Sequence, residues 1–215
     1  MLSFIDTTIE DSDLYIIPQT FRKIVPIAPL KHRDKAPAFS LNRKQGIWQH
    51  LPAETTYLQS IQVKDLLQNS PLVVSFFSPG WNAYADRYLN HLKNLHVRIQ
   101  QAGGNLLVLT TDSVDVLADF ARKQSLSFSV AQDIDQAIAE RFGVYSTSEP
   151  VWDRIAGITE DVPFPALFVL TPDQRIAFSY VDKDFVGEFP AETIVQAVAE
   201  NAAPAEVIGY NRSAA

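Results

Sequence analysis

The amino-acid sequence contains no cysteine. A disulfide, a thiolate nucleophile, a zinc–thiolate site and an iron–sulfur cluster all require cysteine sulfur, so the chain cannot form any of them by itself. The only sulfur atom that it carries is the thioether of Met1. This exclusion limits the chemistry of the protein more than any motif that the sequence contains.

Long apolar runs and a surplus of basic residues are missing as well. No apolar segment reaches the roughly 18 residues of a membrane-spanning helix, so we expect no contact with a membrane. Residues 1–13 carry acidic side chains where a secretion signal would be basic, which favours a cytoplasmic protein. The 25 Asp and Glu residues outnumber the 18 Lys and Arg residues, and the net charge of −7 argues against nucleic acid as a partner.

Common catalytic and metal-binding motifs are also missing. The chain has no Gly-x-Ser-x-Gly, no Walker loop, no Gly-x-Gly-x-x-Gly and no His-Glu-x-x-His, so hydrolase and nucleotide-dependent activities have no support. The four histidines are His32, His50, His91 and His96. His91 and His96 share one predicted helix, but they are separated by about 140° around its axis and do not face one ligand. We therefore expect no metal and no cofactor.

Acidic side chains occur in Asp-x-Asp pairs, two of which begin at Asp133 and Asp182. Neither pair lies in a glycine-rich twelve-residue calcium loop. We expect Asp133 to cap a helix and Asp182 to lie in a turn at the end of a strand.

What the chain does contain fits one folded domain with extensions. Its 215 residues are 47% hydrophobic and 20% charged, which is typical of a globular protein whose core needs no disulfide. We expect an N-terminal arm over residues 1–34, a main domain over 35–203 and a tail over 204–215. The charged stretch Lys-His-Arg-Asp-Lys at 31–35 belongs to an arm packed over the domain, or alternatively forms a basic anion-binding patch.

Apolar periodicity predicts alternating strands and helices from residue 71 onward. The continuous apolar run at 72–77 predicts a buried parallel strand. A helix is expected over 83–102, ended by Gly103-Gly104, because its apolar residues fall on one face. Further strands are predicted at 106–110, 128–130, 166–170 and 175–181, and further helices around 116–120, over 133–142 and from Pro190 as the first helical residue.

The order of these elements predicts the fold class. The turn at 171–174 is short enough only for an antiparallel hairpin. Upstream of residue 71 we expect a hairpin near 39–41 and two helical turns at 63–69. The order β-α-β-α-β-α-β-β-α then gives an α/β protein with a central mixed sheet and helices on both faces. This is a thioredoxin-like layout.

Four segments resemble those of a known family. They are Lys-Ala-Pro-Ala-Phe-Ser-Leu at 35–41, Leu-Val-Val-Ser-Phe-Phe-Ser-Pro-Gly-Trp-Asn-Ala-Tyr-Ala at 72–85, Phe-Pro-Ala-Leu-Phe-Val-Leu at 164–170 and Thr-Pro-Asp-Gln-Arg-Ile-Ala-Phe at 171–178. In this order they are similar to peroxiredoxin-like proteins of the alkyl hydroperoxide reductase / thiol-specific antioxidant (AhpC/TSA) group. Many members of that group have Gly-Trp-Cys-Pro-Tyr-Cys after the first strand. The resemblance covers about residues 35–200 and implies the thioredoxin-like fold.

The resemblance fails at the residues that carry the family's chemistry. Asn82 and Ala85 stand where the family motif has its two cysteines. Peroxide reduction by such proteins requires a thiolate that attacks the O–O bond and becomes a sulfenic acid. Neither an amide nor a methyl group can do this, so we predict that the chain has no catalytic residue of the family type.

A binding groove is the feature that the resemblance leaves in place. Its expected lining residues are Pro79, Gly80, Trp81, Asn82, Tyr84, Phe164 and Pro165. Free N–H groups at the start of the helix over 83–102 favour a polar or anionic ligand there. The simpler interpretation is that Asn82 caps this helix while Trp81 and Tyr84 only pack. The resemblance also implies a cis Phe164–Pro165 bond facing the turn, and a trans bond would weaken the groove hypothesis.

Three functional interpretations follow. The first is a non-catalytic binding or scaffold protein that holds a peptide or a small molecule in the groove. The second is a peroxiredoxin-class oxidoreductase that works with a redox group absent from the sequence. The third is a structural subunit, and the resemblance implies a homodimer in which Tyr145 or Trp152 supplies an exposed aromatic contact.

Overall fold

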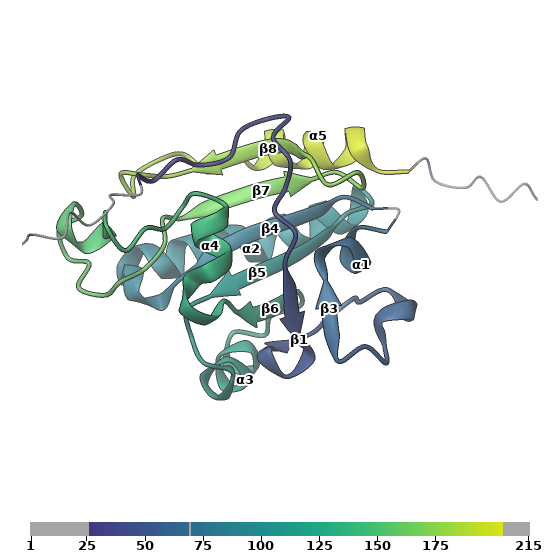
Figure 1. Ribbon diagram of the computed structural model, residues 1–215, viewed down its shortest axis with the longest axis horizontal. Coiled ribbons are helices and arrows are strands. Elements are labelled where there is room, and N and C mark those ends of the chain that lie inside the picture. Colours follow the sequence, from purple (N-terminus) through teal and green to yellow (C-terminus); the bar gives the residue numbers. More distant parts are fainter. Residues whose placement is uncertain (1–25, 69, 204–215) are drawn as a thin grey trace, which may run out of the picture.

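A six-stranded mixed sheet forms the centre of the protein in the computed structural model, which describes residues 26–68 and 70–203 (Figure 1). The strands are β1 (Ser40–Asn42), β2 (Gly46–Ile47), β3 (Ser60–Gln62), β4 (Leu72–Phe77), β5 (Asn105–Thr110), β6 (Ser129–Gln132), β7 (Ala166–Leu170) and β8 (Ile176–Val181). The helices are α1 (Val63–Leu67), α2 (Ala83–Gln101), α3 (Val114–Lys123), α4 (Ala137–Arg141) and α5 (Ala191–Asn201). Among the described helices, none has the length and apolarity to cross a membrane.

The order of strands in the sheet is β2-β6-β5-β4-β7-β8. Strand β4 lies in the middle, parallel to β5 and antiparallel to β7, while β7 and β8 form an antiparallel hairpin. The predicted order of elements from residue 72 onward is therefore confirmed. The chain leaves the carboxyl end of β4 for α2, the longest of the described helices. Because β4 is an inner strand, the turn between them lies at the middle of the sheet.

Helices cover both faces of the sheet, as predicted. In β4, Val73 and Phe77 belong to one apolar core, together with residues of α2, α3 and α5. Their neighbours Leu72, Val74 and Phe76 belong to a second core, with residues of α1 and α4. Alternate residues of a strand point to opposite faces, so a continuous apolar run such as β4 is what a sheet buried on both sides requires.

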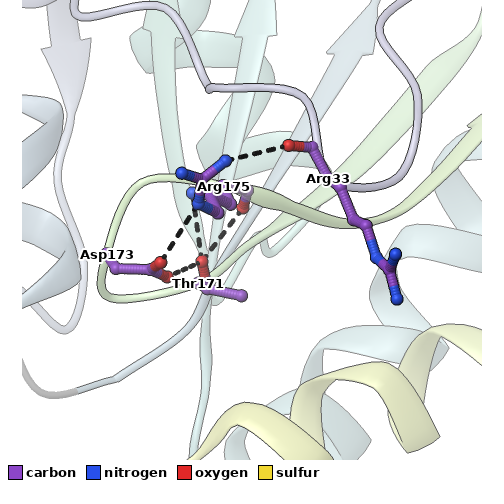
Figure 2. A network of polar contacts seen from close by, with 4 residues as sticks. All are labelled: Arg33, Thr171, Asp173 and Arg175. Atoms are coloured by element: carbon purple, nitrogen blue, oxygen red, sulfur yellow. Dashed lines mark hydrogen bonds and ion pairs between the residues drawn. The ribbon is translucent and has the colours of Figure 1, made fainter.

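The described part of the N-terminal arm lies across the edge of the domain. Arg33 and Asp34 exchange backbone hydrogen bonds with Ile176 of β8, at 2.8 and 2.9 Å. Figure 2 shows how the β7–β8 turn holds this segment: the Arg175 guanidinium donates to the carbonyl of Arg33 at 3.2 Å and lies 3.5 Å from the Asp173 carboxylate. Residues 1–25, which make up most of the predicted arm, lie outside the described residues.

Another arm contact explains why residue 143 is glycine. The Leu30 N–H donates to the carbonyl of Phe142, which brings the arm against the end of α4. Gly143 has a φ of +70°, and a Cβ added there would lie 1.9 Å from the carbonyl oxygen of Ala28. Only glycine provides both the backbone conformation and the space.

Three predictions of local structure need correction. The strand near residues 39–41 pairs with a strand 20 residues on, with Leu41 opposite Ile61, instead of forming a local hairpin. Pro190 precedes α5, because its ψ of 58° is not helical. The helix predicted over 133–142 is interrupted by positive φ angles at Asp135 and Gln136, so it is divided into a 3-10 turn (Ile134–Gln136) and α4. Asp133 still caps it, since its carboxylate accepts the N–H groups of two α4 residues.

The histidines of α2 face different neighbours. The His91 ring stacks on Phe189 with centroids 4.9 Å apart. The His96 ring is buried, and its Nδ1 lies 2.9 Å from Oγ of Ser127. Burial, and secondly the nearby His50, lowers the pKa of His96, so this imidazole is uncharged at neutral pH.

Candidate functional site

The turn between β4 and α2 is fixed by its own residues. The Ser78 hydroxyl accepts the N–H of Gly80 at 3.1 Å, and the proline ring of Pro79 pre-sets the backbone of the single helical turn that follows. Asn82 then has a φ of +54°, and α2 begins at Ala83. The side chain of Asn82 is exposed at this helix start, where N–H groups without intrahelical acceptors create a positive end.

Trp81 anchors the turn in the core. Its side chain is 1% exposed, and its indole N–H donates to the carbonyl of Pro163 at 2.9 Å. The ring makes edge contacts with Phe77, Tyr88 and Phe185, at centroid distances of 5.4 to 6.0 Å. The interpretation of Trp81 as a packing residue is therefore confirmed.

Asn82 does not cap α2 with its side chain, so that part of the simpler interpretation is wrong. Its amide Nδ2 donates instead to the carbonyl of Gly157, in the loop that follows residue 150. The carbonyl of Gly157, and not an N–H group of the first helical turn, is therefore the hydrogen-bond partner of this side chain. The amide thus attaches the loop to the start of the helix.

A pocket of about 230 Å³ lies between this loop and the helix start. The wall on the loop side comes from Ile155, Ala156, Gly157 and Ile158, and Phe185 contributes an aromatic face. The helix side comes from Trp81, Asn82, Ala83 and Tyr84. The pocket therefore combines apolar walls with one amide side chain and the positive end of α2.

The expected groove residues divide into two groups. Trp81, Asn82 and Tyr84 line this pocket. Pro79 is exposed on the turn, whereas Gly80, Phe164 and Pro165 are buried and do not line it. Ala85, the second position at which the family motif carries a cysteine, is only 6% exposed and belongs to the core beneath the pocket.

The Phe164–Pro165 peptide bond is trans, so the prediction of a cis bond is wrong. The trans form leaves both flanking backbone groups satisfied: the Phe164 N–H donates to the carbonyl of Val144, and the Pro165 carbonyl accepts the N–H of Asp182. The trans isomer is also the usual one for X–Pro bonds in folded proteins. Because Pro165 is buried, it does not provide the groove wall that the resemblance implied.

Asp182 lies outside the pocket lining and holds Tyr84, which lines the pocket. Its carboxylate accepts the Tyr84 hydroxyl at 2.8 Å and the N–H of Gly187 at 2.8 Å, which confirms its expected place in a turn at the end of a strand. Burial, followed by the hydrogen bond to Asp182, raises the pKa of Tyr84. The phenol therefore stays protonated and holds Asp182; it is not poised to act as a nucleophile or base at neutral pH.

Two carboxyl groups lie near the turn on its strand side. The Glu160 carboxylate lies close to Gly80: a Cβ added there would lie 2.5 Å from its Oε2, so a side chain at residue 80 would displace this carboxylate. Burial, and then the charge of Glu160, raises the pKa of Asp112. The strand side of the turn is thus acidic, and an anionic ligand is favoured only at the helix start.

A larger hollow of about 450 Å³ lies between β1 and α4. Its charged side chains already serve the fold: Asp133 caps α4, and the Arg141 guanidinium donates to the carbonyl of Ala38. We therefore place the candidate site at the smaller pocket beside Asn82.

Of the two aromatic residues expected at a subunit contact, one is exposed and the other is buried. Tyr145 is only 6% exposed, and its hydroxyl donates to the carboxylate of Asp161. Trp152 is 49% exposed and lies in the segment that leads into the loop wall of the pocket. The expectation of an exposed aromatic side chain thus holds for Trp152 and is wrong for Tyr145.

Sequence reasoning missed the loop wall of the pocket and Phe185. The segment after Tyr145 has neither helical nor strand periodicity, so nothing in its pattern indicates which side chains point inward. Phe185 has a φ of +58°, a conformation that no local signal predicts for an aromatic residue.

Comparisons with known proteins give a matching family model, a similar curated protein and similar solved structures. A model described as "AhpC/TSA family" matches residues 32–179. Peroxiredoxin Bcp of Escherichia coli (strain K12) is 27% identical over 158 residues, which cover 72% of this chain and 87% of that protein. Among solved structures, peroxidoxin BcpB from Mycobacterium tuberculosis matches with a TM-score of 0.60 and 16% identity, over 81% of this chain and 99% of that one. A thiol peroxidase from Chromobacterium violaceum also gives 0.60 and 16%, over 82% and 90%. These structures confirm the thioredoxin-like α/β fold.

Proposed function

The chain belongs to the AhpC/TSA family, and from that premise we propose that it is a binding module whose pocket beside Asn82 holds a ligand instead of reducing peroxide. The observation that carries the proposal is the chemistry at the two family cysteine positions. One holds an exposed amide that is hydrogen-bonded to the pocket wall, and the other holds a buried methyl group. Neither group can replace a thiolate.

The character of the pocket indicates the class of ligand. Apolar side chains of Ile155, Ile158 and Phe185 favour an aliphatic or aromatic group. The positive end of α2, next to Asn82, favours a negative or hydrogen-bond-accepting group on the same ligand. We therefore expect a peptide segment or a small molecule that carries an apolar group beside an anionic one.

Binding of 8-anilinonaphthalene-1-sulfonate, which is apolar and anionic, tests this proposal. Ala156→Trp fills the pocket from an exposed loop position and should weaken binding at least tenfold in a fluorescence titration. Ala118→Trp, on the exposed face of α3 and outside the pocket, is the matched control and should leave affinity within twofold. Equal affinity in both variants, or no binding to the unmodified protein, would contradict the proposal.

The alternative function is a peroxiredoxin-class oxidoreductase that depends on a redox group from outside the chain. Purified protein should consume no hydrogen peroxide beyond the buffer rate over repeated additions. Oxidation of Met1 removes at most one equivalent per chain and does not turn over without a separate reductase. Steady consumption over many equivalents in metal-free, cofactor-free protein would favour the oxidoreductase.

We also propose that the protein forms a homodimer through the surface around Trp152. An aromatic side chain that is half exposed in this way suits a contact between subunits. Light scattering at micromolar concentration should give about 48 kDa, twice the 24.0 kDa of one chain, and Trp152→Asp should shift the mass to that of a monomer. A mass of 24 kDa for the unmodified protein would reject the dimer.

A further inference from the structure

His50 and His96 lie side by side although they are far apart in the sequence. His50 belongs to the loop after β2, and His96 belongs to the second half of α2. The centroids of the two imidazole rings are 5.6 Å apart, and the ring planes are inclined by 39°. His96 lies 14 residues beyond Asn82, about 21 Å along the helix, so this pair is separate from the pocket.

The two rings differ in how firmly they are held. The His96 side chain is 2% exposed, packs edge-on against Phe128 and has its Nδ1 2.9 Å from Oγ of Ser127. Its other ring nitrogen, Nε2, has no hydrogen-bond partner among residues 26–68 and 70–203. His50 is exposed, and its ring can turn about its side-chain bonds toward His96. One imidazole is therefore fixed and the other is adjustable.

The separation of the rings fits a metal bridge. Two imidazoles on one tetrahedral ion, with metal–nitrogen bonds of about 2.0–2.1 Å, have ring centroids about 5 Å apart. We propose that His50 and His96 together bind a divalent transition-metal ion of the class that prefers imidazole, namely zinc, copper or nickel. Among the described residues no group of three or more His, Asp or Glu side chains could hold a metal, so water or a bound molecule completes the coordination.

Ser127 gives the fixed ligand its orientation. When Nδ1–H of His96 donates to Oγ of Ser127, the lone pair of the ring is on Nε2, the nitrogen that has no protein partner. A hydrogen bond on the second ring nitrogen is what holds a metal-binding histidine in one tautomer. Ser127 is thus a positioning residue for the site.

Copper(II) is the probe for the principal experiment, because its electron paramagnetic resonance spectrum reports how many nitrogens bind it. The full-length protein should bind one Cu²⁺ with two imidazole nitrogens. His50→Asn keeps a residue that tolerates the φ of +52° at this position, and it should lose one nitrogen and at least tenfold in affinity. The control His91→Gln, on the same helix, should leave affinity within twofold. An unchanged spectrum and affinity in His50→Asn would overturn the proposal.

A second measurement needs no variant. Diethyl pyrocarbonate modifies accessible imidazoles, and mass spectrometry locates the modified residues. Saturating Zn²⁺ should slow modification of His50 at least fivefold and leave the rates of His32 and His91 unchanged. Equal rates at His50 with and without Zn²⁺ would count against the site even if Cu²⁺ bound elsewhere on the protein.

Discussion

Asn82→Cys should give the protein a peroxide-reactive thiol, whereas Ala85→Cys should not. The Asn82 side chain is exposed beside the first N–H groups of α2, which stabilise a thiolate and lower its pKa. The Ala85 side chain points into the core, where burial raises the pKa of a thiol and excludes the oxidant. We expect the Asn82→Cys thiol to react with iodoacetamide and with hydrogen peroxide at least tenfold faster than the Ala85→Cys thiol.

Stopped-flow measurement of the rate of sulfenic acid formation in the two variants tests this difference. The unmodified protein has no cysteine and gives the background rate. A positive φ such as the +54° of residue 82 is less favourable for cysteine than for asparagine. Asn82→Cys should therefore also lower the free energy of unfolding by about 1 kcal/mol. Similar slow rates in both variants would mean that the helix start no longer activates a thiol. Faster reaction of Ala85→Cys would mean that the turn is far more open than its packing indicates.

Trp81→Ala should be the most destabilising single substitution at the site. The indole is almost completely buried and contacts four other aromatic rings, so its removal should lower the free energy of unfolding by about 3–5 kcal/mol. Trp81→Phe retains much of the apolar contact but leaves the Pro163 carbonyl without its donor, which costs about 1–3 kcal/mol.

Urea unfolding measures both effects, and Trp152→Ala supplies the control. Trp152 is half exposed, and its removal from a monomer should change stability by no more than about 0.5 kcal/mol. The measurement should be made at low protein concentration, where self-association contributes least. A loss below 1 kcal/mol in Trp81→Ala would show that the turn is not anchored by the core.

The sheet and its helices could be predicted from sequence because their signals are local. The apolar run of β4 and the helical stripe of α2 are each contained in a short window, and the turn at 171–174 is too short for any connection but a hairpin. The pairing of β1 with β3 was missed because it depends on residues 20 positions apart, which periodicity does not report.

The candidate site was only half predictable for the same reason. Residues 79–84 follow directly from the end of β4, so the turn and the helix start could be located. The loop wall and Phe185 reach the pocket through tertiary contacts, and the pairing of His96 with His50 crosses 46 positions. Helical geometry relates His96 only to other residues of α2, such as His91, and gives no information about a partner from another segment.

The position of residues 26–36 has a consequence for how the chain folds during synthesis. Arg33 pairs with Ile176, so 143 residues (176 − 33) must follow the arm out of the ribosome before its partner exists. At about 5–20 residues per second this takes about 7–29 s, during which the apolar side chains of this segment have no sheet edge to cover. The central strands β4, β5 and β6 can pair within that time, because all three precede β8. The arm therefore pairs with β8 only after the central strands can have formed, and it covers a sheet edge that does not exist when the arm itself is made.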